Sequence, residues 1–399
     1  MVERLVGTIQ PYAWGSTTFI PELLGEEPTG EPQAELWLGA HSSASATVGG
    51  RRLDALIAED PEAVVGGPTV EAFGTGLPFL LKVLAAAKPL SLQAHPSRQQ
   101  AEAGFAREQK AGIPLDAGHR LYKDDWPKPE MLCALVDSEA LCGFRDPVES
   151  YRFFQRLGVA AALDLVAPLS QEDRPPEERV ATVFERLLRL SGDERSVVTA
   201  VTAAAAGARS DGAFGLFART ARELGEHYND DPGILAALLM NRIAQRPYQA
   251  VFLGAGNLHA YLNGAGVEIM ANSDNVMRGG LTPKHVDADE LLAILDFTPG
   301  QPDLVEPVEE VPGCWRYPTP APEFALWRVE PGDAPIELPV PELARVLLVT
   351  EGAVTIQGDG ELGLKRGEAA FVRAGEKVAV TGSGTLFVAG PGLDLAARA

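Results

Sequence analysis

The sequence predicts a mainly β protein of the α+β class, in which a helical block interrupts one β domain and a second β domain follows. Short apolar runs bounded by glycine and proline dominate residues 1–145, 246–300 and 308–399. Residues 146–245 are instead rich in Ala, Leu, Arg and Glu at a 3.6-residue spacing, which is typical of amphipathic helices. We therefore expect a β domain split by a helical insertion, followed by a small antiparallel barrel or jelly roll.

The composition is that of an ordinary globular protein of 399 residues, with 46% hydrophobic and 22% charged residues. No apolar run reaches the roughly 18 residues that span a bilayer, and residues 1–7 contain no apolar signal core. The net charge of −21 argues against nucleic acid and anionic membranes as partners, because both require clustered Lys and Arg. The three cysteines form no zinc-finger or disulfide pattern, which fits a reducing cytoplasm.

One segment of the first β part carries a polar face. The stretch Lys88-Pro-Leu-Ser-Leu-Gln-Ala-His-Pro96 alternates, so that Ser91, Gln93 and His95 share one face of a strand. On pattern alone this is typical of a half-exposed antiparallel strand. The alternative is that Gln93 and His95 hold a metal ion. The preceding apolar run, 79–87, predicts a buried strand that contains Lys82.

A helix and a long loop follow. Ser97 is placed to cap a helix over about 97–109. Residues 112–129 are polar and contain Pro and Gly, and this connection exceeds the roughly 12–15 residues beyond which a loop is usually functional. The loop ends at Glu130, where the strand 131–136 begins.

The helical block predicts helices over 148–158, 177–190, 195–208, 213–227 and 233–243. Strands resume at 250–253, 258–262 and 267–271, so the block is inserted into a β domain. One more helix is expected over 288–295, before a Pro- and Asp-rich linker at 298–307. The last domain contains no histidine, and we interpret it as structural.

Four side chains could form a metal site. His259 lies on a short strand after a Gly-Ala-Gly-Asn turn, and a lone strand histidine is typical of a satisfied core or surface residue. Glu130 taken alone is typical of a strand edge. Together, however, the four residues Gln93, His95, Glu130 and His259 offer two imidazoles, a carboxylate and an amide oxygen. Such a set suits Zn²⁺ or another borderline divalent ion.

A second dense cluster of polar residues lies in the segment Val267-Glu-Ile-Met-Ala-Asn-Ser-Asp-Asn-Val-Met-Arg-Gly-Gly-Leu-Thr-Pro-Lys-His285. Its short polar side chains are also what turns require. Arg278 and Lys284 near Asp274 are nevertheless what an anionic substrate would need in so acidic a protein. Ser91 and Lys82, on adjoining strands, could add to this site.

Seven segments between residues 10 and 284 together resemble a known family. They are Gln10-Pro-Tyr-Ala-Trp-Gly-Ser16, Ala34-Glu-Leu-Trp-Leu-Gly-Ala-His41, Leu77-Pro-Phe-Leu-Leu-Lys-Val-Leu84, Leu90-Ser-Leu-Gln-Ala-His-Pro96, Lys128-Pro-Glu130, Gly256-Asn-Leu-His-Ala-Tyr-Leu262 and Ala271-Asn-Ser-Asp-Asn-Val-Met-Arg-Gly-Gly-Leu-Thr-Pro-Lys284. The family is that of the type I mannose-6-phosphate isomerases (phosphomannose isomerases).

The resemblance implies a cupin-type β barrel that carries one zinc ion, a helical insertion, and a second cupin-like domain at the C-terminal end. The site residues that it implies are Gln93, His95, Glu130 and His259 as zinc ligands, Arg278, Lys128, Glu268 and Asp274 as catalytic residues, and Lys284, Ser91 and Lys82 as substrate-binding residues. The implied reaction is the interconversion of D-mannose 6-phosphate and D-fructose 6-phosphate through an enediol, with a base among Lys128, Glu268 and Asp274. We expect a cytoplasmic monomer whose partner is this small sugar phosphate.

One departure from the family pattern bears on activity. The family usually reads Asp-x-Asn-His-Lys-Pro-Glu, whereas here Trp126-Pro127 replaces the Asn-His pair. A catalytically weak or inactive protein that binds a sugar phosphate is therefore one alternative. A cupin-type metal oxygenase is another, although Gln93 as a ligand and the basic residues argue against it.

Overall fold

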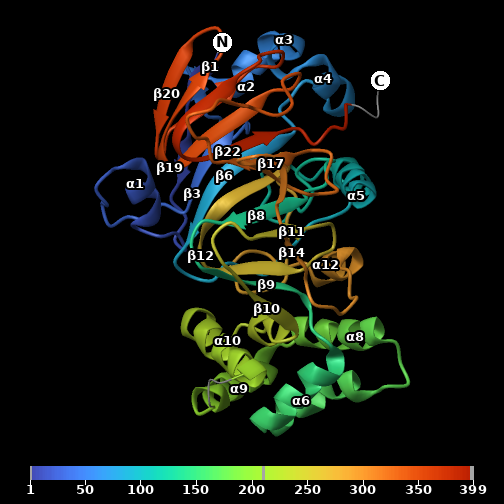
Figure 1. Ribbon diagram of the computed structural model, residues 1–399. Coiled ribbons are helices and arrows are strands. Elements are labelled where there is room, and N and C mark those ends of the chain that lie inside the picture. The colour runs from blue at the N-terminus through green and yellow to red at the C-terminus, as the bar shows by residue number, and fades with distance from the viewer. Residues whose placement is uncertain (1, 209–211, 396–399) are drawn as a thin grey trace.

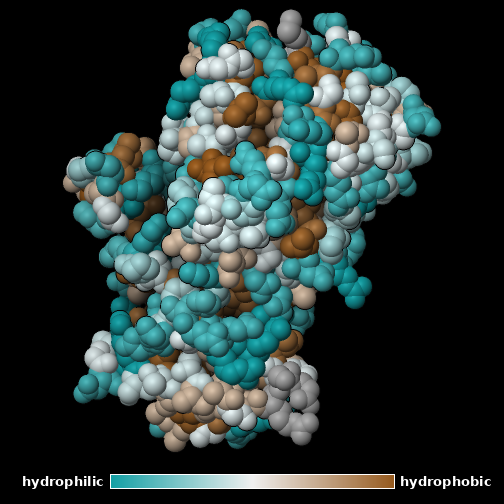
Figure 2. Space-filling model, turned by 90° about the vertical axis from the view of Figure 1, so that its left-hand side faces the viewer, coloured by the Kyte–Doolittle hydropathy of each residue, from teal (hydrophilic) through white to brown (hydrophobic). Residues whose placement is uncertain are grey.

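The computed structural model describes residues 2–208 and 212–395, which form three parts stacked along one axis (Figure 1). A C-terminal β part lies at one end, a central β part in the middle and a group of helices at the other end. Among the described residues, no helix is both long and apolar enough to cross a membrane. Hydrophilic residues cover most of the face in Figure 2, with hydrophobic residues scattered between them. The mainly β architecture with a helical insertion is the predicted fold class.

The central part is a large antiparallel sheet organised around one long strand, β12. Its strands are β2 (Thr8–Gln10), β3 (Glu35–Gly39), β6 (Phe79–Ala86), β7 (Gln93–Ala94), β8 (Glu130–Ala134), β9 (Ser138–Phe144), β10 (Met240–Gln245), β11 (Ala250–Leu253), β12 (His259–Ala271), β13 (Met277–Arg278) and β14 (Leu304–Val305). The first half of β12 pairs with β7 and β9, and the second half pairs with β6 and β8. The strand changes neighbours at Gly264, where a φ of +103° and contact with Ser138 leave no room for a Cβ atom.

The C-terminal part is a second large antiparallel sheet, and it includes strands from the start of the chain. Its strands are β1 (Val2–Val6), β4 (Thr47–Val48), β5 (Arg51–Arg52), β15 (Val308–Val311), β16 (Cys314–Tyr317), β17 (Ala325–Val329), β18 (Ile336–Glu337), β19 (Arg345–Gln357), β20 (Glu361–Lys365), β21 (Ala369–Val372) and β22 (Ala379–Gly390). β1 pairs with β21, from Val2 opposite Val372 to Leu5 opposite Ala369. Hydrogen bonding thus joins the first strand to the last domain, across the sequence boundaries expected for the domains.

The helical part lies between β9 and β10 (Figure 1). Its helices are α6 (Pro147–Leu157), α7 (Ala160–Val166), η1 (Ala167–Ser170), α8 (Pro176–Leu188), η2 (Gly192–Arg195), α9 (Ser196–Ala206), α10 (Gly212–Tyr228) and α11 (Gly233–Ala237). The expected helix over 233–243 is wrong in its second half, because α11 ends at Ala237 and β10 pairs with the edge of β9. Residues 234–240 are apolar and buried, so their pattern fits a helix and a strand equally.

Shorter helices border the two sheets. They are α1 (Phe19–Leu24), α2 (Leu53–Glu59), α3 (Pro61–Val65), α4 (Gly67–Phe73), α5 (Arg98–Lys110) and α12 (Ala288–Ile294). The predicted cap of α5 is confirmed, because Ser97 Oγ accepts the Gln100 N–H and the Gln100 side chain accepts the Ser97 N–H. The cap Ser97 lies two residues after His95, and α5 begins at the next residue, Arg98.

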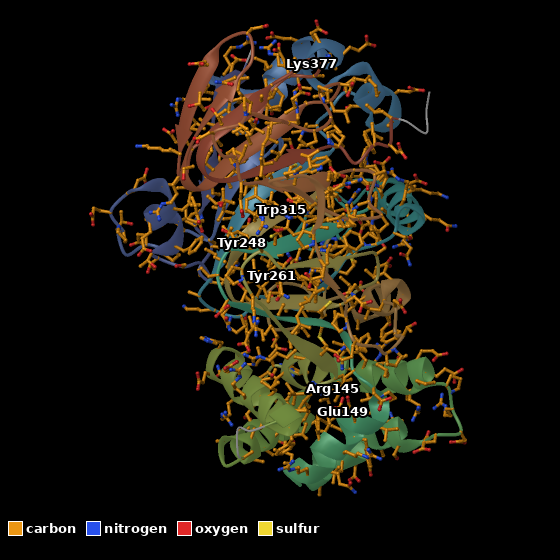
Figure 3. The ribbon with its side chains drawn as sticks, in the orientation of Figure 1. Arg145, Glu149, Tyr248, Tyr261, Trp315 and Lys377 are labelled. Atoms are coloured by element: carbon orange, nitrogen blue, oxygen red, sulfur yellow. The ribbon has the colours of Figure 1, made fainter. Side chains whose placement is uncertain are left out.

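The two sheets share one apolar core, in which Phe79 and Leu81 of β6 pack together with Leu348 of β19 and Phe371 of β21. At the edge of this interface the Arg328 guanidinium lies 4.3 Å from the ring centre of Tyr248 and 4.5 Å from that of Trp315 (Figure 3). Tyr317 also donates to the backbone oxygen of Tyr248 (2.9 Å). The C-terminal sheet therefore supports the central sheet from behind.

Candidate functional site

A cavity of about 460 Å³ opens on the central sheet. Its wall comes from several elements that are distant in sequence: the turn after β2, the strands β3, β6, β8 and β12, the loop 272–284, and Tyr228 at the end of α10. Of the predicted site residues, the cavity is lined by Lys82, Ser91, Gln93, Lys128, Glu130, His259, Glu268, Asp274, Arg278 and Lys284. His95 is fully buried beside it.

His95, Glu130 and His259 form a cluster whose possible ligand atoms all lie within 4.8 Å of one another. Each stands at or next to the end of a strand: His95 directly follows β7, Glu130 begins β8 and His259 begins β12. Glu130 Oε1 lies 3.3 Å from Nε2 of His95, and Oε2 lies 3.5 Å from Nε2 of His259. The side chains are buried, and only Glu130 and His259 border the cavity.

The hydrogen bonds on the far side of each ring define the tautomers. His95 Nδ1 donates to the carbonyl of Asn275 (2.7 Å), and His259 Nδ1 donates to the carbonyl of Asn257 (3.1 Å). When such a ring is neutral, its Nε2 atom carries a lone pair that is directed at Glu130. Nε2 of His95 is buried and makes no hydrogen bond. Two lone pairs facing a carboxylate repel one another unless a cation lies between them, so these residues fit a divalent metal ion.

Gln93 lies directly opposite His259 in the pairing of β7 with β12. Its Nε2 atom donates to Ser91 Oγ (3.1 Å). This bond leaves the amide oxygen Oε1 free to serve as a ligand, which is the atom that the sequence prediction requires. Arg278 lies opposite Gln93 on its other side, in β13, so three adjacent strands bring the predicted ligands and the predicted arginine together.

Charge at the cluster is biased toward an ionised Glu130 and a neutral His95. Burial lowers the pKa of His95 to about 4. Burial alone would raise the pKa of Glu130, but the basic groups of His95 and Lys128 outweigh it and hold that pKa well below the usual range. Lys128 Nζ lies 3.2 Å from Glu130 Oε1. A metal ion would thus meet an ionised Glu130 and a neutral His95.

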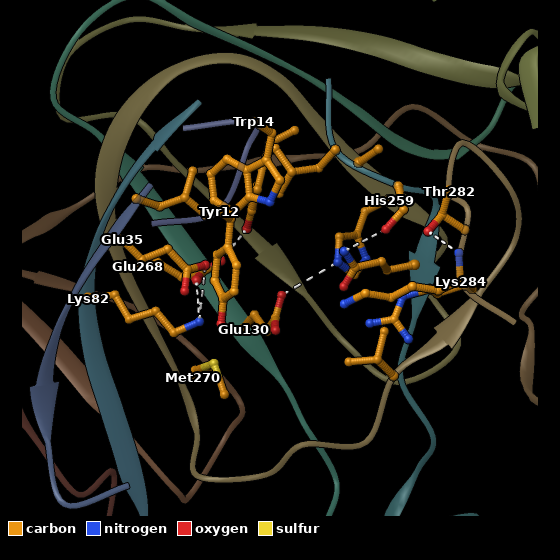
Figure 4. A pocket seen from close by; sticks show the side chains of 18 of the residues that line it. Tyr12, Trp14, Glu35, Lys82, Glu130, His259, Glu268, Met270, Thr282 and Lys284 are labelled. Carbon is orange, nitrogen blue, oxygen red and sulfur yellow. Dashed lines mark hydrogen bonds and ion pairs between the residues drawn. The ribbon is translucent and has the colours of Figure 1, made fainter. Parts of the chain in front are cut away.

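Lys82 lies at the other end of the cavity, between two carboxylates (Figure 4). Its Nζ atom is 3.2 Å from Glu268 and 3.6 Å from Glu35. Burial would lower the pKa of this ammonium, but the two carboxylates outweigh burial and raise it. Tyr261 donates to the second oxygen of Glu268 (2.9 Å). Burial and the nearby Glu130 raise the pKa of Glu268 itself.

Asp274 has a partner that the sequence prediction missed. His41 Nε2 lies 3.3 Å from Asp274 Oδ2, and the His41 side chain is buried whereas that of Asp274 is 53% exposed. The hydrogen bond from His41 lowers the pKa of Asp274. His41 is the last residue of the segment 34–41, in which apolar and polar residues alternate as in a strand. It falls on the same face as Glu35 and Trp37, and this shared face was the sequence feature that could have identified His41 as a site residue.

Asp124 holds the loop that carries Asp274. Its carboxylate accepts Ser273 Oγ (2.7 Å), the Asp274 N–H (2.9 Å) and the Asn275 side-chain amide (3.1 Å). The same amide donates to the backbone oxygen of Trp126 (2.8 Å). The long polar connection before Glu130 therefore fixes both Asp274 and the carbonyl that orients His95.

Arg278 and Lys284 bring two cations to one wall of the cavity. Burial lowers the pKa of both groups, and the Arg278 charge lowers that of Lys284 further. Across the part of the chain that the structure describes, neither side chain forms an ion pair with a carboxylate. In Figure 4 Lys284 lies beside Thr282 and on the opposite side of Glu130 from Lys82. Two unneutralised cations in so acidic a chain favour an anionic ligand.

The comparisons with known proteins agree with one another. A family profile described as "Phosphomannose isomerase type I, catalytic domain" matches residues 2–147. The mannose-6-phosphate isomerase of Escherichia coli strain K12 is 38% identical over 395 residues, which cover 96% of this chain and 98% of that protein. The human mannose-6-phosphate isomerase is 32% identical over 410 residues, 93% of each chain.

Solved structures give the same result. The apo form of mannose 6-phosphate isomerase from Salmonella typhimurium superposes with a TM-score of 0.90 at 36% identity, over 98% of this chain and 99% of that one. A mannose 6-phosphate isomerase bound with zinc and yttrium superposes equally, with a TM-score of 0.90 at 36% identity over 98% of this chain and 100% of that one. By sequence over 96% of its length and by fold, this chain belongs to the type I mannose-6-phosphate isomerase (phosphomannose isomerase) family.

Proposed function

We propose that this chain is a zinc-dependent isomerase that interconverts D-mannose 6-phosphate and D-fructose 6-phosphate. The main support is that one cavity combines two kinds of group. An imidazole–carboxylate cluster there is suited to a metal ion, and the two cations Arg278 and Lys284 lack carboxylate partners among the described residues. The relatives described as mannose-6-phosphate isomerases, one of them bound with zinc, support both the substrate and the metal.

Gln93, His95, Glu130 and His259 would hold the zinc ion. When bound, zinc supplies Lewis-acid chemistry that stabilises negative charge on the sugar oxygens. The carbonyls of Asn275 and Asn257 hold the two imidazoles in the tautomer that ligation needs.

Lys284 and Arg278 would bind the phosphate group, together with Ser91, which lines the same cavity two residues before β7. Charge-assisted hydrogen bonds from two cations suit a dianion. Lys82 is already neutralised by Glu35 and Glu268. We therefore assign Lys82 to holding Glu268 in the cavity, in place of the phosphate contact expected from the resemblance.

The reaction moves a proton between C2 and C1 of the open-chain sugar through an enediol. Of the three candidate bases, we favour Asp274. One oxygen of Glu268 accepts a hydrogen bond from Tyr261, and the other faces the ammonium group of Lys82. Lys128 forms an ion pair with Glu130. Asp274 is half-exposed and lines the cavity, and its contact with His41 uses only the Oδ2 atom. Lys128 would donate to the oxygen on which negative charge develops, and Arg278 would clamp the substrate.

A coupled assay on mannose 6-phosphate, with and without a chelator, tests the proposal. We expect isomerisation that is lost on chelation and recovered on adding zinc. Conversion that is insensitive to the chelator would contradict the metal assignment. Binding of the sugar phosphate without conversion would contradict the enzyme assignment.

We also propose that the protein acts as a monomer in the cytoplasm. The cysteines Cys133, Cys142 and Cys314 are buried and unpaired, which suits a reducing compartment. Light scattering during size-exclusion chromatography should give a mass near 42.4 kDa. A mass of twice that value would contradict the monomer.

A further inference from the structure

The turn between α10 and α11 meets the loop that carries Lys284. This turn belongs to the helical part. Its residue Asp231, together with Gly233 at the start of α11, lies against Gly280, Leu281 and Thr282 of the loop. On its other side the loop is hydrogen-bonded to the segment before Gln93, through Gly279 N–H to Leu92 O (2.9 Å). The phosphate side of the cavity is therefore held between the central sheet and the helical insertion.

Asp231 links the two segments through its carboxylate. Oδ1 accepts the N–H of Gly233 (2.7 Å), and Oδ2 accepts the N–H of Thr282 (3.3 Å). Thr282 Oγ1 in turn accepts the N–H of Lys284 (3.1 Å), a bond drawn in Figure 4. A short chain of hydrogen bonds thus runs from the helical insertion to the backbone of Lys284.

The backbone on both sides of this contact is tightly constrained. A Cβ atom at Gly233 would lie 2.7 Å from Leu281 N, and one at Gly280 would lie 2.6 Å from Gly233 Cα. Leu281 itself has a φ of +56° and is buried. A non-glycine residue in this left-handed region is strained, so the surrounding contacts must hold the loop in place.

We propose that Asp231 is a positioning residue that fixes the Thr282–Lys284 loop and thereby sets the affinity of the site for the phosphate of its substrate. The helical insertion then takes part in substrate binding without contributing a group to the chemistry. This inference rests on the proposed function, because it concerns the phosphate site of the same cavity.

Two variants and a matched control test the inference. Asp231→Ala removes both acceptors, whereas Asp231→Asn keeps one acceptor for Gly233 and presents an amide N–H to Thr282. Asp230→Ala removes the same charge from the exposed neighbouring residue. We expect both Asp231 variants to raise KM for mannose 6-phosphate by about 3–10-fold, with kcat within about twofold, because one hydrogen bond supporting the phosphate contact is lost. Asp230→Ala should leave both constants within about twofold.

A double-mutant cycle separates positioning from general destabilisation. In a Lys284→Met background, adding Asp231→Asn should change KM by less than about twofold, since the contact through which Asp231 acts is already missing. An equal effect in both backgrounds, an effect on kcat alone, or an equal effect of Asp230→Ala would overturn the inference. If Asp231→Ala unfolds, as judged by circular dichroism, the Asn variant decides.

A binding measurement keeps this inference separate from the proposed function. If the unmodified protein does not isomerise mannose 6-phosphate, the proposed function fails, and calorimetric titration with inorganic phosphate decides the inference. Asp231→Asn should then weaken phosphate binding by the same about 3–10-fold. An unchanged Kd, or no phosphate binding by the unmodified protein, would overturn it.

Discussion

His41 is a hydrogen-bond donor to Asp274. Its Nδ1 atom accepts the backbone N–H of Ser43 (3.3 Å), so the ring proton is on Nε2, which lies 3.3 Å from Asp274 Oδ2. His41 thus holds the half-exposed carboxylate toward the cavity, and its hydrogen bond lowers the pKa of Asp274. The pair is separate from the metal cluster, and its effect on catalysis can be measured separately.

Replacing His41 by Leu should move the acid limb of the pH profile upward. The hydrogen bond from His41 favours the charged form of Asp274, so without it the pKa rises and a higher pH is needed to ionise the base. We expect the acid limb of kcat/KM to shift by up to about one pH unit, which corresponds to about 1.4 kcal/mol. The profile should be measured at saturating zinc. In His41→Gln, which keeps a hydrogen-bond donor, the acid limb should shift less. Identical pH profiles for the unmodified protein and the two variants would show that Asp274 is not the group that titrates in that limb.

Glu130→Gln should abolish tight metal binding. The carboxylate is the only negative charge in the cluster of His95, Glu130 and His259, and its loss leaves two neutral rings and an amide. We expect zinc affinity, measured by competition with a chromogenic chelator, to fall by at least about 10–100-fold. Glu268→Gln is the control, since Glu268 pairs with Lys82. That variant should keep its zinc affinity unchanged.

Lys82 and Lys284 should respond in opposite ways to replacement by Met. Lys284 is exposed, so Lys284→Met should change stability by less than about 0.5 kcal/mol and raise KM by about 10–100-fold through the lost charge-assisted bond. Lys82→Met leaves Glu35 and Glu268 buried without a counter-charge. It should destabilise the fold by about 3–5 kcal/mol. Urea unfolding and steady-state kinetics check the two effects; a large rise in KM for a stable Lys82→Met protein would return Lys82 to the phosphate site.

Trp126→Ala should lower thermal stability more than activity. Trp126 replaces the Asn that the family usually has, and it lies 4.7 Å from the guanidinium of Arg98 and 6.0 Å from the ring of Phe73. Arg98 in turn reaches Glu323 of the C-terminal part (3.3 Å). We expect Tm to fall by about 1–4 °C, with kcat/KM within about threefold. Asp125→Ala, at an exposed neighbour, is the control; an unchanged Tm for Trp126→Ala would show that the stacking does not stabilise the loop.

Local pattern predicted much of the site. The alternation between Lys88 and Pro96 placed Ser91 and Gln93 on one face, and the structure brings both into the cavity wall. The length of the connection before Glu130 marked it as functional, and Asp124 in that loop organises the residues around Asp274. These signals succeed because each depends on residues that are close in sequence.

Features that depend on distant pairing were not predictable. Nothing in the pattern of Met240–Gln245 separates a helix from a strand; the free edge of β9 decides it. Nor does the pattern of Val2–Val6 reveal that its partner is β21. The roles of His41 and Lys82 also depend on partners that only the folded chain brings into contact. The partner of His41 is Asp274, and the partners of Lys82 are Glu35 and Glu268.

The pairing of β1 with β21 has a consequence for how the protein is made. Val2 leaves the ribosome long before Val372, its partner in the sheet, has been translated. At about 5–20 residues per second the first strand waits on the order of tens of seconds with its backbone edge unpaired. During that interval the nascent chain exposes a strand that could pair with another chain, so expression yield should depend on chaperone supply more than the stability of the finished fold would suggest.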